Sequence, residues 1–346
     1  MQALTISAHG GFDRIEVANL PIPEVTDPAS VRLKMRAGAL NHLDLFVIGG
    51  LPGVTIGPNW ILGADGCGVI DQLGGRVAGL SKGDRVIINP GISDRSCEYC
   101  LDGEQPLCPK FGILGEHLPG VFAEYAIVPA ANVRRIPDSI SDADAAAFTL
   151  ATLTAWRMVV TRARVEKDEQ VLIWGIGGGV AQAAMRICLD RGATVWVTSS
   201  DERKLDRAKE LGAHETINHR GVDVGKLIRE RTGKRGVDVV VDNVGQATWQ
   251  QSLGALGRRG RLVTCGATSG PEVKTDVRRL FWNQWSILGS TMGNDAEFEA
   301  ITDELHAGRL RPVVDEVLPL SEGRAAFERL AAGEQFGKIV LSINPR

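Results

Sequence analysis

The feature that most constrains this chain is a cluster of glycines that follows a strand-like apolar run at residues 171–174. Small and apolar residues at helical spacing come next, so the segment predicts a strand, a tight turn and a helix. The helix N-terminus would present free N–H groups and the positive end of its dipole to an anion. A dinucleotide pyrophosphate fits this geometry best, and an ordinary strand-to-helix turn is the alternative. The residues that we expect at the cofactor are Gly175, Gly177, Gly178, Gly179 and Val180.

A second strand, predicted over 194–198, ends where dinucleotide folds read the adenosine ribose. An acidic residue at that tip favours NAD, whereas hydroxyls and nearby cations favour the 2′-phosphate of NADP. Here the tip carries serines followed by basic residues, so we expect NADP(H). Asp201 leaves the alternative of a ribose hydroxyl contact, and a solvated helix start would explain the same residues. The residues that we assign to the ribose end are Ser199, Ser200, Arg203 and Lys204.

The composition is that of a globular protein, because 44% of the 346 residues are hydrophobic and 23% are charged. The net charge is −3 and no basic run stands out, so we expect neither a nucleic-acid nor a membrane partner. No apolar run reaches about 18 residues, the length of a membrane span, and we expect no signal peptide. Three of the six cysteines are scattered among apolar or glycine-rich surroundings and favour a cytoplasmic protein with reduced thiols.

The chain changes character near Ser141. Before it, short alternating runs such as Val31–Met35 are interrupted by glycine and proline, which is typical of a strongly bent, barrel-like domain. From Ser141 an alanine-rich helix begins, and strands then alternate with helices from Val171 to Ser290. Near-continuous apolar strands separated by helices predict a parallel sheet covered on both faces. The predicted fold class is α/β, with a β-rich part and a doubly wound parallel sheet.

Six motifs, in this order along the chain, resemble the medium-chain dehydrogenase/reductase superfamily: Ala39–Asp44, Leu62–Val69, Gly83–Val86, Gly120–Tyr125, the turn at Gly175 and Phe336–Leu341. The chain looks most similar to zinc-type alcohol dehydrogenase-like proteins. The resemblance implies a GroES-like catalytic domain over 1–145, completed by 293–346, and a Rossmann domain over 146–292. It also implies a homodimer or homotetramer, joined partly through a sheet edge at Trp285–Met292.

The positions that ligate catalytic zinc in the family carry other residues here. They read Asn41, Ala64 and Leu150, and neither alanine nor leucine can ligate zinc. The family's proton-relay hydroxyl and histidine fall on Leu43 and Phe46. The resemblance therefore implies a site without catalytic zinc, in which a zinc alkoxide plays no part.

This site resembles instead the quinone oxidoreductases, which carry asparagine and aspartate at the positions of Asn41 and Asp44. Reduction without zinc needs a donor to the carbonyl oxygen as charge builds on it. Asn41 is the candidate donor, and an asparagine that bonds its own turn backbone is the alternative. Asp44 and Asp65 are further catalytic candidates, with a purely structural role as the alternative for both. Asp65 stands where the family has a glutamate near the metal.

Further cofactor contacts follow from the resemblance and from the carboxyl ends of the predicted strands. His42 and Lys338 align with residues that contact the pyrophosphate in relatives. Ligands of doubly wound sheets bind beyond the carboxyl ends of the strands. We therefore expect two segments at the nicotinamide, with an ordinary small-residue turn as the alternative. They are Asn243, Val244 and Gly245, and Cys265 and Gly266.

Three clustered cysteines match the family's structural zinc lobe. The spacing Cys97-x2-Cys100-x7-Cys108 supplies three ligands, and the first family cysteine falls on Asp94. Aspartate also binds zinc, so one structural zinc on these residues is the expectation. A degenerate lobe with three free thiols is the alternative.

These features together predict an NADPH-dependent oxidoreductase that reduces a small carbonyl compound, with an enone or quinone preferred, by hydride transfer without catalytic zinc. Conjugation suits such a site because it spreads the charge that develops on the oxygen. The alternatives are an aldehyde or ketone reductase of the alcohol dehydrogenase type, and a catalytically weak nucleotide-binding protein.

Overall fold

The computed structural model describes residues 1–344 and divides the chain into two compact units. Unit 1 is formed by Met1–Ala151 and the chain from Gly293 onward, and unit 2 by Thr152–Met292. The first boundary falls inside helix α3 (Asp142–Trp156), later than the predicted boundary at residue 145. The change in composition at Ser141 marks the start of this helix, which continues without a break past the predicted boundary.

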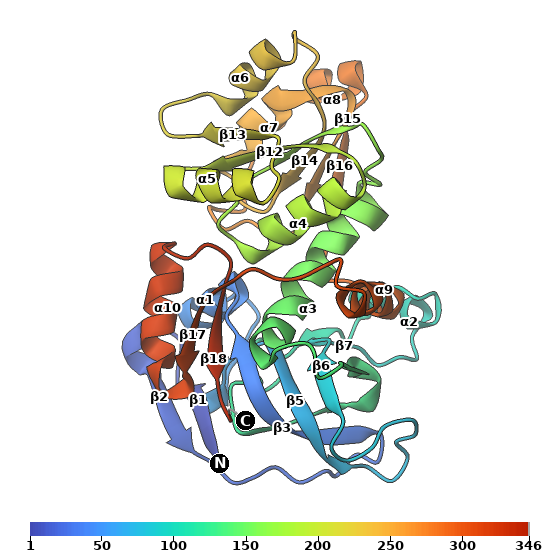
Figure 1. Cartoon of the computed structure of the whole chain (residues 1–346), viewed down its shortest axis with the longest axis vertical. Coiled ribbons are helices and arrows are strands. Elements are labelled where there is room, and N and C mark those ends of the chain that lie inside the picture. The colour runs from blue at the N-terminus through green and yellow to red at the C-terminus, as the bar shows by residue number, and fades with distance from the viewer. Residues whose placement is uncertain (345–346) are drawn as a thin grey trace. The chain divides into compact units, whose positions relative to one another are not determined.

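Unit 2 is the predicted parallel sheet, with strand order β13-β12-β11-β14-β15-β16 and every pair parallel. In Figure 1, helices α4 and α5 lie on one side of this sheet and α6 and α7 on the other. The strands are β11 (Gln170–Ile173), β12 (Thr194–Ser199), β13 (Glu215–Asn218), β14 (Val237–Asp242), β15 (Leu256–Thr264) and β16 (Ser286–Gly289). The helices are α4 (Gly179–Asp190), α5 (Glu202–Glu210), α6 (Val224–Arg231), α7 (Trp249–Ala255) and α8 (Val277–Asn283).

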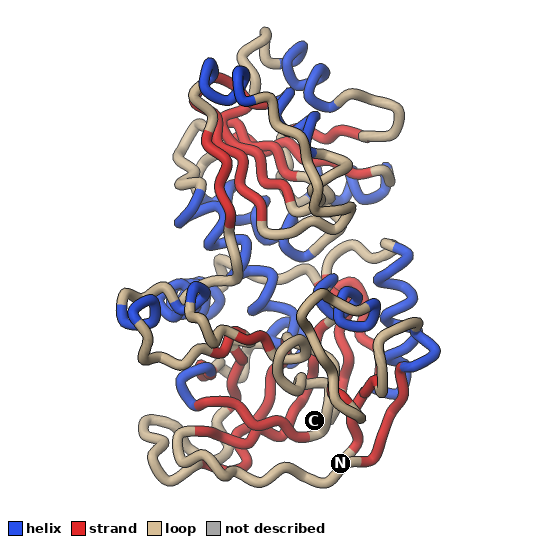
Figure 2. The backbone as a smooth tube through the Cα atoms, turned by 180° about the vertical axis from the view of Figure 1, so that it is seen from behind, coloured by secondary structure: helices blue, strands red, loops and turns tan. Residues whose placement is uncertain are grey.

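Burial explains why the central strands of unit 2 are apolar at every position. Val171, Leu172 and Ile173 of β11 are all fully buried, because helices cover both faces of the sheet. Figure 2 shows the strands side by side, with helices around them. The carboxyl ends of β11, β12 and β14 therefore meet at one edge, where the glycine turn begins.

Unit 1 is built on a seven-stranded sheet with the order β10-β6-β5-β3-β18-β17, in which β9 also pairs with β3. Its strands are β3 (Ser30–Ala39), β5 (Asp65–Leu73), β6 (Arg85–Ile88), β9 (Tyr125–Pro129), β10 (Val133–Arg135), β17 (Val314–Pro319) and β18 (Lys338–Ser342). The smaller sheets hold β1 (Gln2–Ile6), β2 (Ile15–Asn19) and β4 (Trp60–Ile61), and β7 (Gly91–Ile92) with β8 (Gly112–Ile113). The helices, besides α3, are α1 (His42–Gly49), α2 (Glu98–Leu101), α9 (Asp295–His306) and α10 (Gly323–Ala332).

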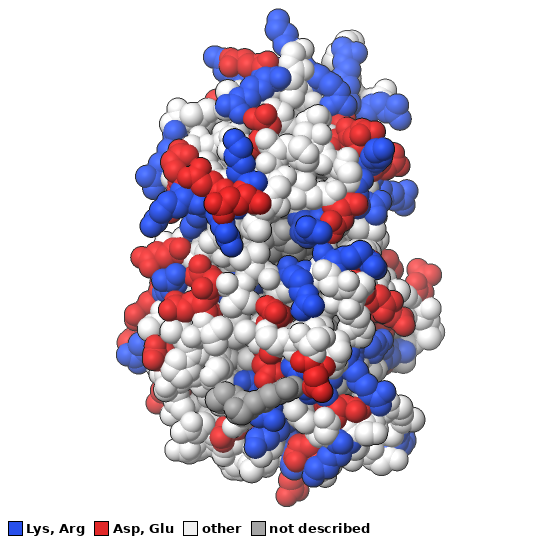
Figure 3. Space-filling model, viewed as in Figure 1, with Lys and Arg blue, Asp and Glu red and all other residues white. Residues whose placement is uncertain are grey.

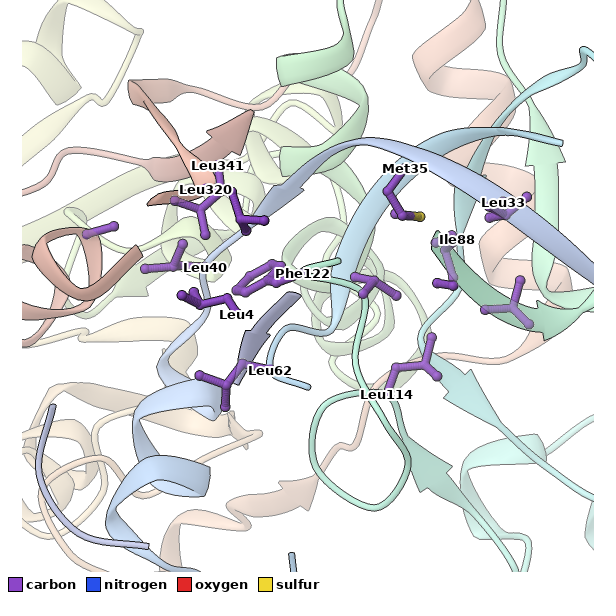
Figure 4. Close-up of a cluster of buried hydrophobic side chains, with 14 of the residues drawn as sticks. Leu4, Leu33, Met35, Leu40, Leu62, Ile88, Leu114, Phe122, Leu320 and Leu341 are labelled. Atoms are coloured by element: carbon purple, nitrogen blue, oxygen red, sulfur yellow. The ribbon is translucent and has the colours of Figure 1, made fainter. Parts of the chain in front are cut away.

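The core of unit 1 surrounds Phe122, which lies beside Leu4 in Figure 4. The backbone N–H of Phe122 donates to Leu62 O at 2.9 Å, and the Phe122 ring packs on Gly63. A Cβ on Gly63, whose φ is +94°, would lie 2.2 Å from that ring, so only glycine fits. This packing fixes the chain immediately before Asp65, the first residue of β5.

Candidate active site

The glycine turn of unit 2 leaves open space for a ligand. Gly175 has a φ of +70°, and a Cβ placed on it would meet no atom within 4 Å. Thr198 of β12 holds the turn, because its hydroxyl accepts from Gly175 N at 3.2 Å and its carbonyl from Ile176 N at 2.9 Å. The next strand therefore fixes the start of the turn, and its outer side stays open.

Helix α4 begins directly after this turn and runs for 12 residues. Within residues 1–344, the N–H groups of Gly179 and Val180 have no hydrogen-bond acceptor. Unpaired N–H groups at the positive end of a helix dipole are suited to an anion. The geometry fits the pyrophosphate of a dinucleotide, with Gly177 and Gly178 in the same turn.

The tip of β12 carries a buried serine and a charge-balanced aspartate. Ser199 Oγ accepts from Asp201 N at 3.1 Å, and Asp201 caps helix α5 by accepting from Arg203 N at 2.9 Å. The Arg203 guanidinium also binds the Asp201 carboxylate at 3.0 Å and thereby lowers the pKa of that carboxyl. Ser200 and Lys204 lie on either side of this cap. Asp201, the carboxylate that could otherwise contact a ribose hydroxyl, is therefore paired with Arg203 of the same chain.

His219 also lies at this tip, although the sequence reasoning did not include it. Its backbone N–H donates to Ser199 O at 3.1 Å, and its ring lies 6.0 Å from that of Trp174. Among the described residues, its buried Nδ1 has no hydrogen-bond partner. Burial and the neighbouring Arg220 lower the pKa of His219. The position of His219 just beyond the carboxyl end of β13 is the signal that could have found it.

The two segments expected at the nicotinamide follow neighbouring strands. Asn243–Gly245 follow β14, Cys265 and Gly266 follow β15, and the strands pair in parallel up to Asp242 and Thr264. Ser269 joins the segments, because its N–H and hydroxyl both donate to Val244 O, at 2.9 and 2.7 Å. The structure therefore brings these predicted residues together within unit 2.

A buried carboxylate that the sequence reasoning missed supports the first of these segments. Asp242 accepts from the backbone N–H groups of Val244 and Gly245 at 2.9 and 3.1 Å. The hydroxyls of Thr248 and Ser252 also donate to it, at 2.8 and 2.6 Å. A fully buried carboxylate with this many donors fixes the backbone of the loop that follows it.

In unit 1, four residues from three separate parts of the chain form a buried group, which we call the polar cluster: Asn41, Asp44, Asp65 and Lys338. The Lys338 ammonium donates to Asn41 Oδ1 at 2.5 Å and to Asp65 Oδ2 at 3.1 Å. Asn41 Nδ2 donates to the same Asp65 oxygen at 3.0 Å. Asp44 Oδ2 accepts from the backbone N–H of Asn41 at 2.8 Å.

Two titratable groups in and beside the polar cluster are shifted by their burial. Burial raises the pKa of Asp44 to about 7, although the hydrogen bond from Asn41 N and the charge of Lys338 oppose the shift. Burial and the nearby Lys338 ammonium lower the pKa of His42. A carboxyl group with a pKa near neutrality can both donate and accept a proton at physiological pH.

The three positions of the family's catalytic zinc ligands do not fit a metal. Asn41 offers an amide oxygen that is already bonded to the Lys338 ammonium, and Ala64 and Leu150 carry no donor atom in their side chains. The backbone N–H of Leu150 instead donates to Asp65 Oδ1 at 2.7 Å. The Lys338 ammonium therefore lies beside the first of the three positions that hold catalytic zinc in the family. The predicted absence of catalytic zinc remains a prediction.

The resemblance implies that Lys338 contacts the cofactor pyrophosphate, which stays a prediction. Among the described residues, its ammonium donates to Asn41 and Asp65 in unit 1. Asn41, the expected donor to the substrate, also has partners. One of its amide hydrogens reaches Asp65, and the other is directed to Ala39 O at 3.3 Å. The pairings with Lys338 and Asp65 join residues that lie far apart in the sequence, whereas Ala39 is only two positions from Asn41.

The predicted metal ligands Asp94, Cys97, Cys100 and Cys108 come together in unit 1, and their ligand atoms all lie within 4.8 Å of one another. Tetrahedral zinc places its ligand atoms about 4 Å apart, so the group fits zinc with little adjustment. Asp94 is held in place by the backbone N–H groups of Ser96 and Cys97, which donate to its Oδ1 at 2.9 and 3.0 Å. These bonds hold the pKa of Asp94 well below its usual range, so the carboxylate is charged and ready for a cation.

Comparisons with known proteins agree with this architecture. Residues 27–138 match the family model "Alcohol dehydrogenase GroES-like domain", and residues 179–307 match "Zinc-binding dehydrogenase". A zinc-type alcohol dehydrogenase-like protein of Schizosaccharomyces pombe is 30% identical, over 96% of each chain. A quinone oxidoreductase of Pongo abelii is 26% identical, over 99% of this chain and 97% of the relative. A solved structure described as an NAD-dependent alcohol dehydrogenase is 42% identical, with a TM-score of 0.94, over 99% of this chain and 100% of that chain.

The chain belongs to the medium-chain dehydrogenase/reductase superfamily. It is an oxidoreductase that depends on a nicotinamide nucleotide, built from a GroES-like domain and a Rossmann domain. The predicted family and fold class are therefore confirmed. No helix among the described residues is long and apolar enough to cross a membrane.

Proposed function

We propose that this protein reduces a small conjugated carbonyl compound, an enone or a quinone, with hydride from NADPH and without a catalytic zinc. One observation carries the proposal: at the first zinc-ligand position, the oxygen of Asn41 is bonded to the buried ammonium of Lys338. A site that already holds a cation of its own repels a second one. Zinc alkoxide chemistry has no place there, and conjugated carbonyls are the substrates that need the least electrophilic help.

The preference for NADP(H) rests on the tip of β12. A carboxylate that is free to bind the ribose hydroxyls would repel the 2′-phosphate, whereas Asp201 forms an ion pair with Arg203 at 3.0 Å. Ser199, Ser200 and Lys204 add hydroxyls and a positive charge nearby. Because the 42%-identical solved relative is described as NAD-dependent, NADH is the rival cofactor and must be tested beside NADPH.

The residues of this chain would hold the cofactor and stabilise charge. When bound, the nicotinamide supplies a hydride, which is a proton with an electron pair. The turn from Gly175 to Val180 binds the pyrophosphate, and the segments after β14 and β15 bind the nicotinamide end. In the polar cluster, hydrogen-bond donors stabilise the oxygen of the substrate as negative charge develops on it.

We also propose that the lobe of Asp94, Cys97, Cys100 and Cys108 binds one structural zinc. Four ligands from one loop close the coordination sphere, which leaves no open position for a substrate. The metal would stabilise the lobe and take no part in the reaction.

The partners that we propose are a small-molecule carbonyl substrate and a second copy of the chain, in a cytoplasmic homodimer or homotetramer. Strand β16 is the edge of the parallel sheet, and beside it in the sequence α8 exposes Phe281 by 62% and Trp282 by 76%. An open strand edge with exposed aromatic side chains favours pairing with another copy. On the face drawn in Figure 3, basic and acidic side chains are interspersed, which supports neither a nucleic-acid nor a membrane partner.

The experiment that tests the proposal measures oxidation of NADPH and of NADH by the purified protein with enones, quinones and simple aldehydes. We expect turnover with the conjugated compounds and a higher kcat/KM with NADPH. Product analysis should show the saturated ketone or the hydroquinone. Activity confined to simple aldehydes would favour an alcohol dehydrogenase-type enzyme, and binding of NADPH without turnover would favour a nucleotide-binding protein. Either result would contradict the proposal.

A further inference from the structure

We propose that Lys338 is a catalytic residue that takes over the electrophilic role of the missing zinc: its ammonium donates the hydrogen bond that stabilises the substrate oxygen during reduction. The inference rests on the proposed function. It names Lys338 as the donor to the substrate oxygen, in place of Asn41, which the sequence had suggested. It also gives Lys338 a role different from the pyrophosphate contact that the resemblance implied.

The Lys338 ammonium lies among the positions that correspond to the zinc ligands of the family. Lys338 binds Asn41, at the first zinc-ligand position, at 2.5 Å, and Asp65, beside the second, at 3.1 Å. The other oxygen of Asp65 accepts from the backbone of Leu150, at the third position, at 2.7 Å. A network of hydrogen bonds thus ties Lys338 to all three parts of the chain that hold a metal in the zinc enzymes.

Lys338 and Asn41 differ in the hydrogen-bond donors that they can offer to a substrate. An ammonium has three N–H groups, and within residues 1–344 that of Lys338 has only Asn41 and Asp65 as partners, which leaves one N–H for a ligand. Asn41, in contrast, already directs both amide hydrogens to Asp65 and to Ala39 O. Lys338 is therefore the better placed donor.

The residues of the polar cluster also differ in their exposure to solvent. Asp65 is 0% exposed, whereas Lys338 and Asn41 retain 5% and 8% of their surface. Of these three residues, Lys338 and Asn41 therefore keep some exposed surface, and Asp65 keeps none. A buried positive charge acts on a developing negative charge more strongly than it would in water.

The chemical step balances without a metal. The β-carbon of the enone receives a hydride with its electron pair, and the electron pair of the C=C bond moves through the conjugated system onto the oxygen. The oxygen then carries the negative charge that the Lys338 ammonium stabilises. A proton from water completes the reduction, so that the enone becomes a saturated ketone and the nucleotide is oxidised.

The test separates contact with the substrate from contact with the cofactor. Lys338→Gln alone would leave the buried Asp65 carboxylate without its positively charged partner, so we combine it with Asp65→Asn, which removes the negative charge but keeps a side chain that can hydrogen-bond. Loss of one donor to a developing oxyanion costs about 100- to 1,000-fold in kcat. We expect that loss in the D65N/K338Q variant, while the Kd for NADPH, measured by fluorescence, stays within about twofold, because the pyrophosphate site at the helix terminus is intact.

Two further variants complete the test. Lys338→Arg keeps the positive charge and should retain at least about a tenth of the wild-type kcat. Lys34→Gln, at an exposed position of β3, is the control and should behave like the wild type. Wild-type kcat in D65N/K338Q would overturn the inference. A rise in the NADPH Kd of about tenfold or more would assign Lys338 to the pyrophosphate and overturn it as well. If the wild type itself reduces no carbonyl compound, the proposed function fails, and the inference fails with it.

Discussion

Replacement of Asp44 by asparagine should change how the stability of the protein depends on pH. Asp44 is buried in α1, and burial raises the pKa of its carboxyl to about 7, well above the value of about 4 that is usual for an aspartate in an unfolded chain. Between these pH values the folded protein keeps a proton that the unfolded chain releases. The free energy of unfolding of the wild type must therefore fall as the pH rises through this window, and the loss is complete above about pH 7.

The size of the effect follows from the difference between the two pKa values. The difference between the pKa of Asp44 in the folded and in the unfolded protein corresponds to about 4 kcal/mol in the free energy of unfolding, of which about 3 kcal/mol is lost between pH 5 and pH 8. Asparagine cannot ionise, and its oxygen can accept the same hydrogen bond from Asn41 N, which is 2.8 Å long. The D44N variant should therefore gain about 3 kcal/mol relative to the wild type across this range.

Urea unfolding followed by far-UV circular dichroism at several pH values between about 5 and 8 measures this gain. Asp13→Asn removes an exposed carboxylate from the same unit and serves as the matched control, with no change expected in the pH dependence. If the curves of wild type and D44N run parallel with pH, Asp44 ionises normally, and the account of the polar cluster is wrong.

Three further predictions concern the other parts of the molecule. Metal analysis should find one zinc per chain, and Cys97→Ser should remove it and lower the Tm; full zinc content in that variant would rule out the lobe as its site. Ser199→Asp should raise the Kd for NADPH at least about tenfold with little effect on NADH, because a carboxylate repels the 2′-phosphate; equal effects on both would refute the ribose assignment. Trp282→Ser should weaken self-association in light scattering, and a monomeric wild type would contradict the dimer.

The sequence predicted those parts of the fold that neighbouring residues determine. The turn at Gly175 and the fully apolar run of β11 determine a strand, a turn and a helix from neighbouring residues alone. The parallel sheet follows, because strands buried on both faces must be apolar throughout. Helix α8 was not predicted. Its apolar residues Val277, Leu280 and Phe281 stand at helical spacing, but seven residues that bury no side chain give too short a pattern to identify a helix.

The sequence predicted the candidate site only in part, because the hydrogen bonds that form the polar cluster join distant segments of the chain. Asn41 and Lys338 are 297 positions apart, and no local pattern reveals that their side chains meet. The anchoring of the loop by Asp242 is different. Thr248 and Ser252 lie only 6 and 10 residues further on, so a strand-ending aspartate followed by hydroxyls at helical spacing could have predicted it.

The central claim is that hydride transfer here needs no catalytic metal, and zinc content measured together with turnover tests it most directly. Native protein should contain no more than one zinc per chain and should reduce an enone with NADPH at a rate that a zinc chelator does not change over the time of the assay. Two zincs per chain, with turnover that is lost on chelation and restored by added zinc, would contradict the claim. That result would mean that Lys338 yields its place at Asn41 to a metal.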